Sequence, residues 1–272
     1  MVEATIEKTI AFQLAFYLNQ AEECLKIHKE YPALDNSRSY IGAHFSPIRS
    51  FCRKGWTVKE KAIACYKILL ATGAVTTQTL AEKDTRTGRN ALLTLVYTHC
   101  LEHSSGINRF DLYIECMKSY LRPEIWFSQD NNGDTVLTLA CFHCQLDIVK
   151  YVLNQFPLSI PLLFMTTNRK ESPLLIAQEV VNETMEQIPL QRTNIDWHTV
   201  EDQQVVMMIS DDTIRNKFVA ARTILHLLEA MLEKTKRYES QLLHLLIDIF
   251  IAKLPLEIVT LIGSHLVYTV QF

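Results

Sequence analysis

The chain has 272 residues, among them 27 lysines and arginines and 30 aspartates and glutamates, so its formal charge is −3. Hydrophobic residues make up 48% of the sequence and charged residues 21%, which excludes a disordered chain and leaves no basic excess for binding nucleic acid. Only 7 glycines and 8 prolines are present, too few for the many tight turns of an all-β fold. We therefore expect an all-α protein of one large domain or two small ones.

Seven cysteines, an odd number, are scattered along the chain without the regular spacing of a disulfide framework. The first 25 residues lack the basic start of a signal peptide. The longest apolar run, Leu242 to Ala252, contains His244 and Asp248 and is shorter than the roughly 20 residues of a membrane span. These features predict a soluble protein in a reducing compartment, with no membrane span.

Residues 1–40 are expected to form one or two N-terminal capping helices. Apolar residues recur there at three- and four-residue steps, which predicts one buried stripe packed against the following domain. The stripe consists of Ile6, Ile10, Leu14, Tyr17, Ala21 and Leu25.

The stretch from Asp130 to Asn154 has the pattern of a turn followed by two helices. Gly133 allows a tight turn, and the Thr135 hydroxyl is placed to cap the first helix. Leu137 and Ala140 lie three residues apart and share one face, where the small alanine lets a neighbouring helix approach closely.

This stretch resembles the ankyrin-repeat family, whose unit is a β-turn plus two antiparallel helices and opens with T-P-L-H-x-A. Val136 and Thr138 stand where that signature has proline and histidine, and Cys144 replaces the glycine between the helices. The resemblance implies that each helix pair stacks on the next to bury its apolar faces.

Three further stretches, opening at Ser46, Asn90 and Ser172, fit the same template, the last with Lys170 at the glycine position. Together with Thr135, these openings are 44, 45 and 37 residues apart, more than the roughly 33 residues of a regular ankyrin unit. We expect residues 41–182 to form an ankyrin-like helical solenoid of four to five irregular repeats.

The segment 183–210 breaks the pattern, because it contains Pro189, an exposed-looking Trp197 and no long helical period. We expect an insertion or long loop here. Asp211 and Asp212 then cap a helix that is expected to continue to about Lys236.

The end of the C-terminal region, residues 211–272, has two interpretations. In one it is a degenerate last repeat or cap, with helices on both sides of residue 253. In the other it resembles the L-P-x-E-I-x-x-x-I-x-x-x-L opening of an F-box, which recruits the adaptor subunit of cullin ubiquitin ligases. The residues that would bind that adaptor are Leu254, Pro255, Glu257, Ile258 and Ile262.

The sequence contains no phosphate-binding glycine loop, nucleophile elbow, H-E-x-x-H or dinucleotide-binding turn. We therefore expect a non-catalytic protein with no cofactor; an enzyme with an unrecognised site is the alternative. Cys141 and Cys144 have half of a zinc-site spacing, with His99, Cys100, His103 and His143 as further candidates. Because Cys141 falls on the buried face beside Ala140, we expect core cysteines and no metal.

Ankyrin-like proteins bind partners through the turn tips and the inner face of each first helix. The resemblance implies that Tyr97 and Phe142 are exposed aromatics there, of the kind that concentrates interface energy. The acidic residues of the mapped surface, Asp134, Glu171 and Glu179, fall mostly in its last repeat, so its early part is expected to favour an acidic partner surface. The partner-binding residues predicted in this way are Arg53, Lys54, Arg86, Arg89, Tyr97, Asn131, Asn132, Asp134, Phe142, His143, Asn168 and Arg169.

The irregular repeats and the long insertion are similar to those of secreted ankyrin-repeat effectors of intracellular bacteria. This likeness implies an adaptor or scaffold that is delivered into the cytosol of a host cell and binds a host protein in its concave groove. The F-box-like segment implies an alternative, a ubiquitin-ligase substrate adaptor. Neither function involves nucleic acid.

Overall fold

The computed structural model describes residues 2–18, 20–32, 34, 46–53, 59–101, 109–155, 159–187, 209 and 211–251. The regular secondary structure of these residues is entirely helical, which confirms the all-α prediction. The chain divides into two units, residues 1–226 and 227–272.

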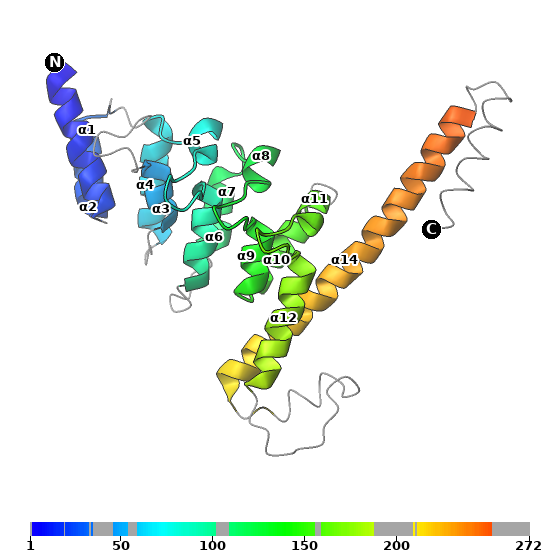
Figure 1. Cartoon of the computed structure of the whole chain (residues 1–272). Coiled ribbons are helices and arrows are strands. Elements are labelled where there is room, and N and C mark those ends of the chain that lie inside the picture. The colour runs from blue at the N-terminus through cyan, green and yellow to red at the C-terminus, as the bar shows by residue number, and fades with distance from the viewer. Residues whose placement is uncertain are drawn as a thin grey trace. The chain divides into compact units, whose positions relative to one another are not determined.

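From residue 47 to residue 164, the first unit repeats two helices followed by a shorter one (Figure 1). In chain order these helices are α1 (Val2–Tyr17), α2 (Ala21–Glu30), α3 (Pro47–Arg53), α4 (Lys59–Ala71), α5 (Thr77–Ala81), α6 (Ala91–Leu101), α7 (Arg109–Met117), α8 (Pro123–Trp126), α9 (Val136–Phe142), α10 (Leu146–Leu153), α11 (Ile160–Phe164) and α12 (Pro173–Glu186). The last helix, α14 (Asp212–Ile251), begins in the first unit and continues into the second.

One row of helices runs through the first unit: α1 contacts α3, α3 contacts α6, α6 contacts α9, and α9 contacts α12. A second helix follows each of α3, α6 and α9 and packs on it, namely α4, α7 and α10. Leu137 and Ala140 of α9 are fully buried, as their shared face predicts. The helices α3, α6 and α9 therefore each lie between two neighbours of the row and also pack on a second helix.

Three helices of the row, α6, α9 and α12, begin after polar residues whose side chains cap them: Asn90, Thr135 and Ser172. Asn90 is fully buried: its Oδ1 accepts from the Leu93 amide at 2.9 Å, and its Nδ2 donates to the Ile125 carbonyl at 3.0 Å. Both ends of this buried amide are thus satisfied. The Thr135 hydroxyl accepts from the Thr138 amide at 3.1 Å, which confirms the predicted cap.

The predicted repeats are longer than a regular ankyrin repeat for a structural reason that the sequence did not reveal. A short additional helix, α5, α8 or α11, lies between each second helix and the next turn (Figure 1). Thr76 and Thr79 cap α5 reciprocally, and prolines stand in the first turns of α8 and α11, where the missing N–H has no intrahelical partner.

The prediction for the N-terminal stripe was wrong about the buried side. Ile6 and Leu14 are exposed, whereas Phe12 and Phe16 are buried. The Phe16 ring packs on Phe51 of α3 with centroids 6.5 Å apart. The buried face of α1 is therefore the one that carries Phe12 and Phe16, and not the one that carries Ile6 and Leu14.

Asp211 caps α14 as predicted, since its Oδ1 accepts from the amides of Thr213 and Ile214 at 2.8 and 3.1 Å. The helix does not end near Lys236, however, but continues to Ile251. The intervening sequence contains neither glycine nor proline, so nothing in the backbone stops it.

Several predictions lie partly or wholly outside the described residues. α12 continues to Glu186, so the first residues of the segment 183–210 are helical, while Trp197 is outside the described residues. The five residues of the F-box-like segment, Leu254, Pro255, Glu257, Ile258 and Ile262, are outside them as well.

None of the described helices is both long and apolar enough to cross a membrane.

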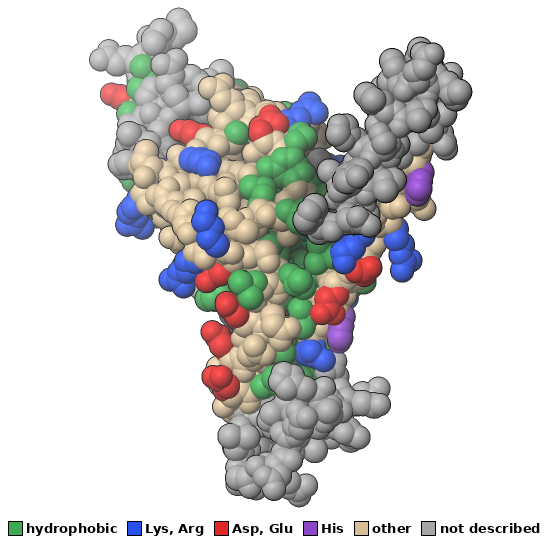
Figure 2. Space-filling model, turned by 45° about the vertical axis from the view of Figure 1, so that its right-hand side comes forward, with side chains coloured by type: hydrophobic (Ala, Val, Ile, Leu, Met, Phe, Trp, Pro, Cys, Tyr) green, Lys and Arg blue, Asp and Glu red, His purple; other side chains and the backbone are tan. Residues whose placement is uncertain are grey.

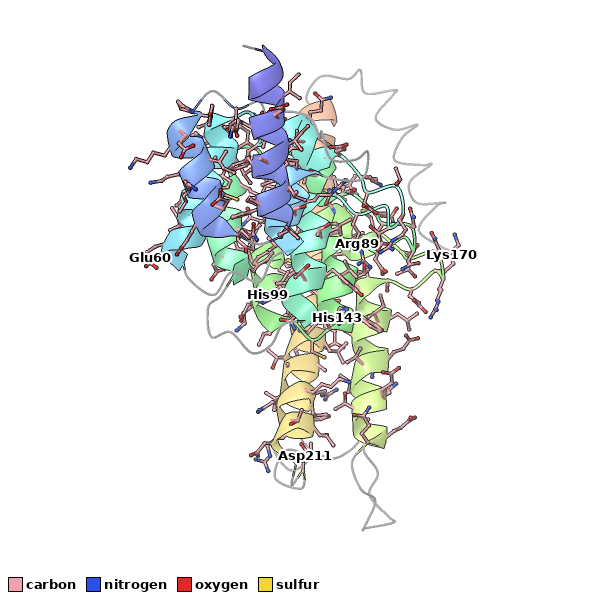
Figure 3. The ribbon with its side chains drawn as sticks, turned by 90° about the vertical axis from the view of Figure 1, so that its left-hand side faces the viewer. Glu60, Arg89, His99, His143, Lys170 and Asp211 are labelled. Atoms are coloured by element: carbon pink, nitrogen blue, oxygen red, sulfur yellow. The ribbon has the colours of Figure 1, made fainter. Side chains whose placement is uncertain are left out.

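Three turns, which precede α6, α9 and α12, are built around one side-chain oxygen each. The turns carrying Arg89 and Lys170 lie on the same side of the first unit, opposite Glu60 (Figure 3). In each turn the oxygen accepts from two backbone amides, which fixes the conformation of the loop. The acceptors are Asp84 Oδ1 (from Arg86 and Thr87), Asp130 Oδ1 (from Asn132 and Asp134) and Thr167 Oγ1 (from Arg169 and Glu171).

Adjacent turns are joined by backbone hydrogen bonds. The Asn131 amide donates to the Thr87 carbonyl at 3.0 Å, and the Asn168 amide donates to the Asn132 carbonyl at 2.9 Å. The side chains repeat the connection, because Asn131 Nδ2 donates to the Arg86 carbonyl at 2.9 Å and Asn168 Nδ2 to that of Asn131 at 2.9 Å. The three turns therefore form one continuous edge.

This edge requires glycine in two of its turns. Gly88 and Gly133 have φ values of +72° and +80°, and a Cβ at these positions would lie 2.3 Å from Asn131 Oδ1 and 2.6 Å from the Asn168 amide nitrogen. Lys170 has the same left-handed backbone, with φ +68°, in the last of the three turns. Left-handed backbone is unfavourable for lysine by about 1–2 kcal/mol.

Replacing Gly133 with alanine is expected to lower the free energy of unfolding by more than about 2 kcal/mol, since backbone strain and a clash with Asn168 add. Lys170→Gly is the matched control, and it should raise stability by up to about 1 kcal/mol because it removes strain alone. Chemical denaturation of both variants measures the two effects. Equal stability of Gly133→Ala and the parent chain would contradict the close approach of the turns.

Candidate functional site

A groove of about 520 Å³ opens between α9, α12 and the turns before them, with Tyr97 of α6 and Arg89 of the turn before α6 completing it. We term it the α9–α12 groove; all of its lining residues belong to the first unit. The lining consists of Arg89, Tyr97, Asn132, Asp134, Leu139, Phe142, His143, Thr167, Asn168, Arg169, Glu171, Ile176, Glu179, Val180 and Glu183.

The structure places eight of the twelve predicted partner-binding residues in this groove: Arg89, Tyr97, Asn132, Asp134, Phe142, His143, Asn168 and Arg169. Arg86 and Asn131 are exposed on the turns but do not line it. Arg53 is the last residue of α3, and its side chain and the whole of Lys54 are outside the described residues. The groove therefore draws on the later turns and helices of the predicted surface.

The floor of the groove is apolar. Leu139 of α9 and Ile176 and Val180 of α12 are buried beneath it. Phe142, at the end of α9, is 58% exposed, and its ring meets His143 edge-on with centroids 5.0 Å apart. An exposed aromatic ring next to an apolar floor is suited to covering by another molecule.

Arg89 is held from two sides. Its guanidinium carbon lies 3.6 Å from the centroid of the Tyr97 ring, and its Nε donates to Asp130 Oδ2 at 3.1 Å. The Asp130 side chain is 1% exposed and that of Arg89 15% exposed, so this is a largely buried ion pair. The Tyr97 ring also meets His143 edge-on, with centroids 6.1 Å apart. The positive charge of Arg89 is thus compensated within the protein.

Carboxylates predominate among the charged groups of the lining. Asp134, Glu171, Glu179 and Glu183 face two arginines, of which Arg89 is already paired. Burial raises the pKa of Asp134, and the carboxylate of Asp130 raises it further, against the effect of the Arg89 guanidinium. The expectation of an acidic partner surface does not extend to this groove, because the sequence did not reveal that Arg89 pairs with Asp130. Figure 2 shows acidic side chains following one another down the lower left edge of the visible surface.

Of the α12 face, Glu179 was predicted from the sequence, whereas Ile176, Val180 and Glu183 were not, and neither was Asp130. Ile176, Val180 and Glu183 form this face with Glu179, at the three- and four-residue spacing of one side of a helix. The spacing is present in the sequence, but it identifies one face of a helix only if the helix extends past Glu183, as α12 does.

The zinc candidates do not assemble in the described part of the chain. No three histidine, cysteine, aspartate or glutamate side chains there are arranged to hold a metal ion. Cys141 is buried in the core, and this burial raises the pKa of its thiol, which disfavours the thiolate that zinc requires. His103 and the side chain of Cys100 are outside the described residues.

A comparison with protein-family models finds no match for the chain, and a comparison with curated proteins finds no similar one.

Replacing Arg89 with methionine is expected to lower the free energy of unfolding by about 2–4 kcal/mol, because it leaves the buried Asp130 carboxylate without its cation. Lys118→Met is the control. It removes an ion pair with Glu115 whose side chains are 59% and 69% exposed, so stability should change by less than about 1 kcal/mol. Urea denaturation at neutral pH provides both values, and similar losses for the two variants would contradict the buried character of the first pair.

Proposed function

We propose that the chain is an ankyrin-like repeat protein without catalytic activity that binds a partner protein in the α9–α12 groove. The observation that carries the proposal is Phe142, a half-exposed ring above the apolar floor of Leu139, Ile176 and Val180. Covering the ring and the floor would remove apolar surface from water at one place, as the central residues of protein interfaces do.

Three features support the ankyrin-like part of the proposal. The row α3, α6, α9 and α12 stacks in chain order with a second helix behind each of the first three. Hydrogen-bonded turns join the units along one edge. Cys144, which stands at the glycine position between the helices, has the left-handed φ of +55° that glycine would adopt there.

The rigidity of the surroundings supports the binding part. Asn132, Asp134, Asn168 and Glu171 are held in the joined turns, and α9 and α12 contact each other directly. A partner would therefore meet preorganised side chains, and little conformational entropy would be lost from the groove when it binds. Hydrogen-bonding groups, charge and an aromatic ring lie side by side there, which is what recognition of a protein segment requires.

Under this proposal the chain acts as an adaptor or scaffold, and its similarity to bacterial effectors makes a host protein the expected partner. The ubiquitin-ligase adaptor stays a separate prediction, because the F-box-like residues are outside the described part of the chain.

Site-specific photocrosslinking tests the proposal. A benzophenone amino acid replaces Phe142, and the labelled full chain is irradiated in eukaryotic cytosol. We expect one discrete adduct, because the side chain at this position lies where the partner would be seated.

Phe164 provides the control position. It is 57% exposed on α11, almost as much as Phe142, but it does not line the groove. The same label at Phe164 should give no discrete adduct. Equal labelling from both positions, or none from residue 142, would show that the groove does not hold a partner protein.

A further inference from the structure

We propose that the α9–α12 groove takes a basic segment of its partner, in which two lysine or arginine side chains flank an apolar residue. The inference rests on the proposed function and adds the chemistry of the partner to it. It comes from the distribution of charge and apolar surface over the lining of the groove.

The carboxylates of the groove follow α12 and the turn before it. Glu179 and Glu183 are exposed and one helical turn apart, about 6 Å along the axis, and Glu171 precedes the helix. Glu171 Oε2 accepts from Thr167 Oγ1 at 3.1 Å, which orients this carboxylate. Asp134 continues the negative surface onto the neighbouring turn.

The position of these acids is unfavourable for α12 itself. Glu183 lies in the last turn of the helix, where the aligned peptide dipoles disfavour negative charge, and that turn contains no basic residue. Glu179 and Glu183 also repel each other at a spacing of four residues. A cationic group of the partner between them would relieve both effects. The two glutamates do not stabilise α12 itself, but they favour a basic partner.

The guanidinium groups of the groove do not cancel this charge. Arg89 forms an ion pair with Asp130 and stacks on Tyr97, so its positive charge is neutralised within the protein. Arg169, on the turn before α12, supplies one positive charge to the lining, which also contains four carboxylates. The net charge of the lining is negative, and complementarity requires a positive partner surface.

The apolar floor sets the second requirement. Phe142 and Val180 line the same groove as Glu179 and Glu183, so a side chain seated on the floor has carboxylates beside it. An extended segment spaces alternate residues about 6–7 Å apart, which matches the separation of the two glutamates. A basic residue, an apolar neighbour and a second basic residue therefore meet complementary groups in one segment.

The test starts with selection of a random-sequence displayed peptide library on the immobilised full chain. We expect enrichment of peptides that combine lysine or arginine with a large apolar residue. Binding of the most enriched peptide, measured by fluorescence anisotropy, should weaken about tenfold in the Glu179→Gln, Glu183→Gln double variant and also at high salt.

The double variant should be at least as stable as the parent chain to heat, because it removes the repulsion within α12; a loss of binding would then not result from unfolding. Glu30→Gln, Glu124→Gln is the charge-matched control, since both residues are exposed and neither lines the groove. It should leave the affinity unchanged.

Two outcomes would overturn the inference and leave the proposed function standing. One is enrichment of acidic or uncharged peptides whose binding still depends on Phe142. The other is binding of basic peptides with the same affinity to both glutamine double variants. If no enriched peptide depends on Phe142, or if residue 142 crosslinks only to a second copy of the chain, both the inference and the proposed function fail.

Discussion

The groove depends on the hydrogen bonds that join consecutive turns. The Asn131 amide reaches the Thr87 carbonyl and the Asn168 amide reaches that of Asn132, so three loops that are distant in sequence become one edge. These are hydrogen bonds between backbone groups, and they bring neighbouring turns so close that a Cβ on Gly88 or Gly133 does not fit. Because each turn leads directly into a helix, the same edge determines where α6, α9 and α12 begin.

The chemistry of the site follows from this placement. Arg89, which stands just before α6, reaches Asp130 in the next turn, while Asp134 and Glu171 occupy the corresponding positions before α9 and α12. Tyr97, Phe142 and Glu179 likewise follow their caps at equal distances in α6, α9 and α12. At these equivalent positions, α6 and its turn carry the paired Arg89 and the ring of Tyr97, whereas α12 and its turn carry the carboxylates of Glu171 and Glu179. The result is a groove whose negative charge increases toward α12.

Local signals were sufficient for much of the fold. Gly133 and Thr135 identify one turn and cap from the sequence alone, and Asp211 identifies the start of α14, because these residues act on the backbone next to them. The N-terminal stripe failed for the opposite reason. The face of α1 that is buried is the one whose Phe16 packs on Phe51, which is far along the chain, and hydrophobic spacing within α1 carries no information about that contact.

The site shows the same division between local and distant causes. The exposure of Phe142 was predicted from the repeat pattern and is confirmed. The pairing of Arg89 was not predictable, because only the structure brings Asp130 to 3.1 Å from it. Of the glutamates in the groove face of α12, Glu179 was predicted, but Glu183 was assigned to the insertion because the helix was expected to end before it. Long-range pairing and helix length decide both points, and neither is encoded in a short motif.

Hydrogen–deuterium exchange of the full chain, with and without the most enriched basic peptide, locates the binding surface, since it reports on backbone amides along the whole chain. We expect slower exchange in residues 131–143 and 168–183 when the peptide is bound, and unchanged exchange in α4 and α5. Protection confined to α1–α5, or spread evenly over the chain, would contradict the assignment of binding to the α9–α12 groove.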